Sequence, residues 1–269
     1  MSGAHGAPGE AMRWRLLVTP PMAAADNMAL DAALMRRAHA TGETVLRVYA
    51  WATPTLSLGR NQPARGRYDE ARAAREGVAI VRRPTGGRAV LHDREVTYSV
   101  TAPADDRAGA GLHASYARIN RLLLDGLRRL GVEASLAAPA GRAAVPSLAP
   151  CFETPAAGEL VAAGRKLVGS AQWRDAGALL QHGSILVADD QPRVAALALE
   201  PVPAPAPPAT LAALLARAPA LDEVAAALFA AVQALEDPSA GPLAVDAELE
   251  GWMAEARRTF TDSAWTWRR

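Results

Sequence analysis

Helical stretches stand out first in the pattern of apolar and polar positions. Residues 23–40 and 115–130 repeat apolar side chains at intervals of three to four, which predicts amphipathic helices. Asp26 is the expected cap of the first, and Gly131 is expected to end the second. Further helices are predicted over residues 68–76, 210–235 and 243–259.

Short apolar runs rich in β-branched and aromatic residues predict the strands. These runs cover residues 13–18, 45–50, 55–58, 78–82, 88–91, 95–100, 166–174 and 178–187. Asp175 and Gly177 separate the last two runs, which predicts a hairpin. Because several strands follow one another after short turns, we expect an α/β fold of the α+β type, with a mixed sheet flanked by helices.

The arrangement of these patterns suggests four parts of the chain. Residues 1–11 are expected to be a disordered tail, and residues 12–199 a single domain. A proline-rich stretch at residues 200–209 predicts an extended linker. Residues 210–269 would then form a small helical extension at the C-terminus.

Composition narrows the classes of function. The chain has 269 residues, of which 50% are hydrophobic, and its net charge of +1 favours neither nucleic acid nor an anionic membrane as a partner. No apolar run is long enough to cross a bilayer, and the first residues lack the pattern of a signal peptide. A single cysteine allows no disulfide within the chain. We therefore expect a cytoplasmic protein without a membrane or nucleic-acid partner.

The only lysine among the 29 basic Lys and Arg residues is Lys166, and the only cysteine, Cys151, lies 15 positions before it. A lysine presents a compact charge, whereas the guanidinium of arginine is broad and planar, so a site that accepts only lysine would explain the exception. Cys151 could be a nucleophile whose thiolate is favoured by a nearby ammonium. Composition alone leaves open a chance lysine and a buried, inert thiol.

Residues 82–93 are the most specific stretch of the sequence. A predicted strand leads into the pair Gly86 and Gly87, and Arg82, Arg83 and Arg88 surround that pair. Paired glycines let a ligand approach the backbone, and arginines beside them suit phosphate or carboxylate. The alternative is a plain hairpin with solvated arginines. His92 and His182 are further candidates for proton transfer, although either could instead orient backbone or line a tunnel.

Three blocks of sequence carry a resemblance to a known family. They are LGRNQ at residues 58–62, RRPTGGRAVLHDREVTYSV at residues 82–100, and GRKLVGSAQ at residues 164–172, followed by LQHGSIL at 180–186. Their order and spacing resemble the lipoate-protein ligases and related octanoyltransferases of the biotin/lipoate ligase superfamily. The likeness spans about residues 12 to 190 and implies the catalytic-domain fold of that superfamily, with an apolar tunnel for an eight-carbon acyl chain.

A cysteine before the lysine resembles the octanoyltransferase branch whose sequences otherwise look like ligases. The resemblance implies Cys151 and Lys166 as catalytic residues and, as substrate-binding residues, Arg82, Arg83, Gly86, Gly87, Arg88, His92, Gly169, Ser170, Gln172, His182 and Gly183. No metal and no cofactor would be needed. Octanoyl or lipoyl would pass from acyl carrier protein to a lysine of a lipoyl domain, in a 2-oxoacid dehydrogenase or the glycine cleavage H protein.

Three other functions fit the same blocks. An ATP-dependent lipoate ligase would need ATP and Mg²⁺, and Lys166 would then contact the carboxylate and the adenylate phosphate. An amidotransferase would move the acyl group between two lipoyl domains through the same cysteine. A carrier-binding relative without catalysis would belong to a different class, and the presence of both Cys151 and Lys166 argues against it.

Overall fold

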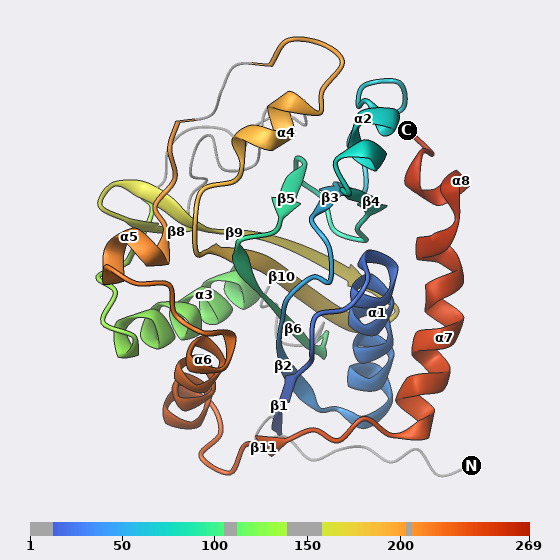
Figure 1. The fold of residues 1–269 in the computed structure, drawn as a ribbon. Coiled ribbons are helices and arrows are strands. Elements are labelled where there is room, and N and C mark those ends of the chain that lie inside the picture. The colour runs from blue at the N-terminus through green and yellow to red at the C-terminus, as the bar shows by residue number, and fades with distance from the viewer. Residues whose placement is uncertain (1–12, 105–111, 139–157, 203–205) are drawn as a thin grey trace, which may run out of the picture.

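A large mixed sheet forms the centre of the computed structural model, which describes residues 13–104, 112–138, 158–202 and 206–269 (Figure 1). Its strands run in the order β11-β1-β2-β6-β10-β9-β8-β7. Their bounds are β1 Trp14–Val18, β2 Thr44–Tyr49, β6 Glu95–Pro103, β7 Ser135–Leu136, β8 Leu160–Ala162, β9 Arg165–Asp175, β10 Ala178–Leu186 and β11 Gly241–Pro242. Strands β11, β1 and β2 are parallel, whereas every other pairing in the sheet is antiparallel. The predicted mixed sheet is confirmed.

A second, smaller sheet carries the glycine turn. It consists of β3 (Thr55–Leu58), flanked by β4 (Ala79–Arg82) on one side and β5 (Val90–His92) on the other. Residues 84–87 form the turn between β4 and β5. Helices α2 (Glu70–Arg75) and α4 (Pro192–Ala196) lie beside this sheet in Figure 1.

Two helices cover opposite faces of the large sheet. Successive side chains of β10 point to opposite faces, as a strand requires. His182 contacts Asp31 of α1 (Ala24–Thr41), whereas Gln181 Nε2 donates to Asn120 Oδ1 of α3 (Leu112–Arg129). Helix α1 therefore packs on the face that carries His182, and α3 on the other.

The C-terminal helices pack against this same domain. Helix α6 (Leu221–Leu235) lies along α3 so closely that a Cβ added at Gly126 would meet Leu228 Cδ2 at 2.6 Å. Leu228 belongs to the core that also holds Trp14 and Leu123. Helix α7 (Ala247–Thr261) runs along α1, and α8 (Ser263–Thr266) follows it towards β4 (Figure 1). The segment expected as an extension thus contributes to the core of the sheet domain.

Two local predictions were wrong. Asp26 is not the cap of α1: Ala23 occupies that position, and Asp26 pairs with Arg257 of α7. The helix predicted over residues 210–235 is divided into α5 (Leu211–Leu215) and α6, because Ala216 adopts a left-handed φ of 54° and Pro219 follows. Among the described residues, no helix combines the length and apolar character needed to cross a bilayer.

Candidate functional site

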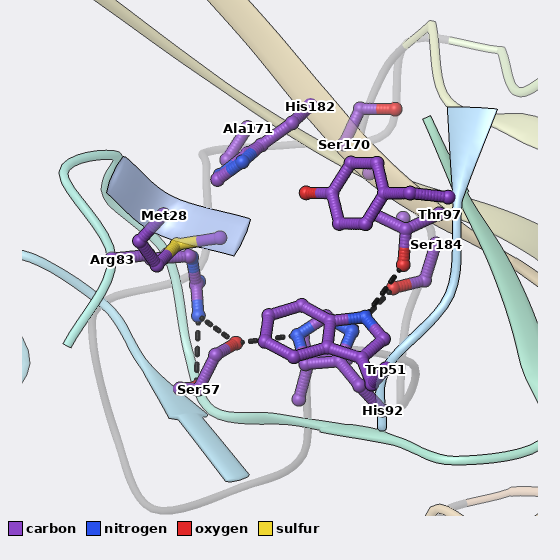
Figure 2. Close-up of a pocket in the computed structure, with 15 residues that line it drawn as sticks. Met28, Trp51, Ser57, Arg83, His92, Thr97, Ser170, Ala171, His182 and Ser184 are labelled. Carbon is purple, nitrogen blue, oxygen red and sulfur yellow. Dashed lines mark hydrogen bonds between the residues drawn. The ribbon is translucent and has the colours of Figure 1, made fainter. Parts of the chain in front are cut away.

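A pocket lies between the two sheets, against α1 and the glycine turn (Figure 2). Most of its lining surface is apolar. Seven residues predicted for the site line it, namely Arg83, Gly87, His92, Gly169, Ser170, His182 and Gly183. The remaining residues that line the pocket were not predicted for the site: Met28, Tyr49, Trp51, Ser57, Val90, Thr97, Ala171 and Ser184. A largely apolar pocket with a few polar groups suits a small ligand with an apolar body.

His92 forms one polar corner of the pocket. Its Nε2 lies 2.7 Å from Ser57 Oγ, its Nδ1 lies 2.8 Å from Glu95 Oε1, and its ring stacks on Trp51 with centroids 4.2 Å apart. Burial alone would raise the pKa of the Glu95 carboxyl, but the charge and hydrogen bond of His92 outweigh it and the pKa is lowered. The ring is therefore held by an ionised carboxylate on one side and a serine hydroxyl on the other.

His182 forms a second polar corner and connects α1 to the glycine turn. Its Nδ1 lies 3.2 Å from Asp31 Oδ2, and its Nε2 lies 2.7 Å from Thr85 Oγ1. Burial lowers the pKa of His182 in spite of the attraction of Asp31, so the ring is neutral near pH 7. Because a carboxylate only accepts, Nδ1–H donates to Asp31 and Nε2 accepts from the Thr85 hydroxyl.

Asp31 anchors this corner, although its sequence context did not single it out as a site residue. Its carboxylate is fully buried and accepts from Arg47 Nη1 at 2.8 Å, Ser99 Oγ at 2.8 Å and Tyr49 OH at 3.1 Å. Burial would raise the pKa of Asp31, but His182 and Arg47 together lower it. A charged residue on the apolar face of a predicted helix, four positions after Asn27, was the available signal.

Arg83 fixes the glycine turn from inside. Its guanidinium donates to the main-chain oxygens of Gly86 at 2.8 Å and Arg88 at 2.7 Å, and to Ser57 Oγ at 3.1 Å. Gly87 has a φ of +94°, which favours glycine. The turn is therefore a rigid wall of the pocket.

Arg82 and Arg88, predicted with Arg83 to surround the glycine pair, do not line the pocket. Adjacent residues of a strand point to opposite sides, so Arg82 of β4 turns away from Arg83. The buried Arg82 guanidinium donates to the main-chain oxygens of Thr266 at 2.7 Å and Gln62 at 2.9 Å. It holds the last helical turn against the loop after β3.

Lys166 is buried, with 3% of its surface exposed, and its Nζ lies 2.9 Å from Glu159 Oε1. A register shift between β8 and β9 puts Lys166 opposite Val161 and Val168 opposite Leu160, so the simple alternation of faces along β9 does not extend from Ser170 to Lys166. Gln172 does not line the pocket and donates to Gln181 Oε1 at 2.8 Å. Lys166 does not line the pocket either. Cys151 lies outside the described residues, and its distance from Lys166 stays a prediction.

Close backbone contacts explain the glycines of β9 and β10. A Cβ added at Gly183 would lie 2.3 Å from the main-chain oxygen of Gly169 and 2.9 Å from Tyr98 Cε1. The Tyr98 hydroxyl lies 2.7 Å from Ser170 Oγ. In the described part of the chain, no group of three or more His, Cys, Asp or Glu side chains could hold a metal ion.

Fold and pocket together define a two-sheet α/β domain with a largely apolar pocket beside a glycine turn. Residues 23–233 match the model of the lipoyl protein ligase A/B catalytic domain, and the chain belongs to this family. The predicted family and fold are confirmed.

Curated relatives carry the name octanoyltransferase LipM. The protein of Kyrpidia tusciae is 50% identical over 181 residues, and that of Carboxydothermus hydrogenoformans is 44% identical over 179 residues. These alignments cover 65% and 66% of this chain, and in each case 66% of the relative, which is just under two thirds of its length.

Solved structures share the fold. Lipoate-protein ligase A bound with ATP has a TM-score of 0.78 at 22% identity, over 95% of this chain and 99% of its own. A bipartite lipoate protein ligase from Thermoplasma acidophilum has a TM-score of 0.76 at 22% identity, over 95% of this chain and 96% of its own. At this identity the likeness concerns the fold alone.

Proposed function

We propose that the protein is an octanoyltransferase, which moves octanoyl from acyl carrier protein to a lysine of a lipoyl domain. The observation that carries the proposal is the likeness, at up to 50% identity, to relatives named octanoyltransferase LipM. The sole cysteine of the chain, placed before the lysine of the GRKLVGSAQ block, supports the same chemistry.

The pocket suits an acyl chain. Met28, Trp51 and Val90 supply apolar surface, and the Trp51 ring stacks on the hydrogen-bonded ring of His92. Burying each methylene of a chain stabilises the complex by about 0.8 kcal/mol. An octanoyl chain would therefore gain affinity from its length alone, without any charged contact.

Transfer would take two steps. The Cys151 thiolate attacks the carbonyl carbon of the carrier thioester, a carbon–sulfur bond forms, and the carrier leaves as a thiolate. The amine of the acceptor lysine then attacks the new thioester, forms an amide after losing a proton, and releases Cys151 as a thiolate. Both steps pass through an oxyanion, which the Lys166 ammonium would stabilise. Glu159 makes a buried ammonium tolerable because it supplies the opposite charge.

This chemistry involves no ATP, Mg²⁺ or other cofactor, since the donor thioester is already activated. The acceptors proposed are lipoyl domains of 2-oxoacid dehydrogenases or the glycine cleavage H protein. Lipoyl would be a second acyl group that the proposal includes, since its body is likewise apolar.

The test is transfer without ATP. Purified protein, octanoyl carrier protein and a lipoyl domain are mixed, and the domain is weighed by mass spectrometry. We expect a gain of one octanoyl group, and an acylated form of the protein that hydroxylamine cleaves. Cys151→Ala should show neither product. A wild-type protein that acylates the domain only with ATP would be a ligase, and full activity in Cys151→Ala would exclude the thioester. Octanoylated H protein as the donor tests the amidotransferase alternative.

A further inference from the structure

A basic patch borders the glycine turn on the outside of the pocket. It consists of Arg60 and Arg65, from the loop after β3, and Arg268, from the end of the chain. The N–H of Arg60 donates to the main-chain oxygen of Thr85 at 2.8 Å, so the patch adjoins the turn directly. Arg268 Nη2 donates to the main-chain oxygen of Arg60 at 2.7 Å, which joins the two segments.

Aromatic rings support this patch. The guanidinium carbon of Arg60 lies 4.7 Å from the ring centroid of Trp173 and 5.5 Å from that of Trp265. Arg268 lies 4.2 Å from the same Trp265 ring. Stacking uses the face of a guanidinium and leaves N–H groups at its edge for another partner. The two stacked arginines are therefore preorganised, and binding orders less side chain than it would for free arginines.

The patch has no acidic side-chain partner among the residues that the structure describes. Within the described ranges, none of Arg60, Arg65 and Arg268 forms an ion pair with an acidic side chain, unlike the exposed Arg36 or Arg217. Burial together with the charges of Arg268, Arg83 and Arg269 lowers the pKa of the underlying Arg82 to about 10. Because the whole chain carries only +1, this positive potential is a local feature.

We propose that the basic patch is the docking surface for an acidic carrier domain, and that donor and acceptor carriers use it in turn. The inference rests on the proposed function, in which one thioester forms and is consumed at one pocket. Both carriers must bring their reacting group to that pocket, and the patch lies beside its wall. Carboxylates of the carrier would pair with the free edges of the stacked guanidiniums.

Direct binding tests this without any turnover. The dissociation constants of acyl carrier protein and of a lipoyl domain, both without an acyl group, are measured by fluorescence anisotropy. Arg65→Glu and Arg268→Glu should each weaken both carriers by about 10-fold, as like charges replace opposite ones. Arg121→Glu is the matched control, since Arg121 is an exposed arginine on α3, a helix that lies apart from α8 and the C-terminus in Figure 1. It should bind both carriers as the wild type does.

A kinetic measurement adds a second readout. The ratio of kcat/KM for octanoyl carrier protein to kcat/KM for octanoyl-pantetheine should fall about 10-fold in the two patch variants. Unchanged dissociation constants in both variants would overturn the proposal, and so would weaker binding of only one carrier. An equal loss with octanoyl-coenzyme A would assign the patch to the phosphate of the arm and also overturn it. Failure of the wild type to transfer octanoyl without ATP contradicts the proposed function alone, because carrier binding is measured separately.

Discussion

His182 and Asp31 are hydrogen-bonded across the interface between the large sheet and helix α1, with 3.2 Å between Nδ1 and Oδ2. The contact joins residues 151 positions apart in the chain. Through Thr85, the same imidazole reaches the glycine turn. One buried carboxylate, that of Asp31, thus sets the tautomer of the His182 ring in the pocket wall. Replacing Asp31 should therefore lower the stability of the fold and alter the pocket wall.

Asp31→Asn should destabilise the protein by about 3–5 kcal/mol, because it leaves the buried charge of Arg47 without its partner. Urea unfolding followed by circular dichroism measures this loss. Ser99→Ala removes a single hydrogen bond to the same carboxylate and should cost about 1 kcal/mol. A loss of less than about 1 kcal/mol in Asp31→Asn would mean that the buried pair does not stabilise the fold.

His182 should make stability depend on pH below neutrality. Its pKa is lowered in the folded protein, so the unfolded chain takes up a proton first as the pH falls. The contribution of His182 is complete above its unfolded pKa of about 6.5 and is lost as the pH falls towards the folded value.

Urea midpoints at pH 7.5 and at pH 5 measure this effect. The midpoint of the wild type should fall between these conditions, and that of His182→Asn should fall less. Asp31 and Glu95 have lowered pKa values too, but their contributions are lost only under more acidic conditions, below the usual carboxyl range. An equal fall in both proteins would exclude His182 as the source.

Two glycines at the same turn should differ in their tolerance of substitution by alanine. A Cβ at Gly59 would lie 2.0 Å from the main-chain oxygen of Gly87, whereas a Cβ at Gly86 would meet no atom within 4 Å. Gly59→Ala should therefore lower the melting temperature and displace the turn, at a cost of about 1–3 kcal/mol. Gly86→Ala is the matched control and should melt as the wild type does.

Gly87→Val should impair transfer through the turn itself. Its φ of +94° disfavours a β-branched residue, and a Cβ there would lie 2.9 Å from Arg83 Nη2. The measurement is kcat/KM for octanoyl carrier protein in the folded variant. Kinetics equal to those of the wild type would show that the turn does not shape the acyl site.

Lys166→Arg should remain folded but lose transfer by about 100-fold or more, if Lys166 stabilises the oxyanion. The lysine is 3% exposed and pairs with Glu159, so the broader guanidinium would keep the ion pair yet displace the charge. Single-turnover transfer from the acylated protein measures the effect. Transfer by Lys166→Arg at a rate near that of the wild type would show that the reaction does not require a lysine at this position.

The sequence predicted those elements whose signals come from residues close together in the chain. The helices, the β9–β10 hairpin and the glycine turn follow from periodicity and turn residues. Arg82 and Arg83 look equivalent as letters, but strand alternation sends one guanidinium into the pocket wall and the other towards the end of the chain. That difference was predictable in principle, because Arg82 ends the predicted strand 78–82 and Arg83 follows it directly.

Partnerships between distant segments were not predictable in the same way. Nothing near Asp31 in the sequence indicates that His182 is its partner, since tertiary packing brings α1 and β10 together. The packing of α6 on α3 was missed for the same reason: the proline-rich stretch before it suggested independence, whereas Leu228 fills the core. The local sequence therefore predicted the helices and strands but not which of them pack against one another.

The pairing of β6 with β10 has a consequence for folding. Ser99 faces His182 across this pair, so the chain must close a loop of about eighty residues before the pocket has both walls. Such non-local pairing forms slowly, and a nascent chain that ends before β10 lacks one wall of the pocket. A ligand of the pocket can recognise only the completed domain. Its binding should therefore raise the unfolding midpoint of the entire chain in proportion to the logarithm of its concentration, without rescuing any partly folded form.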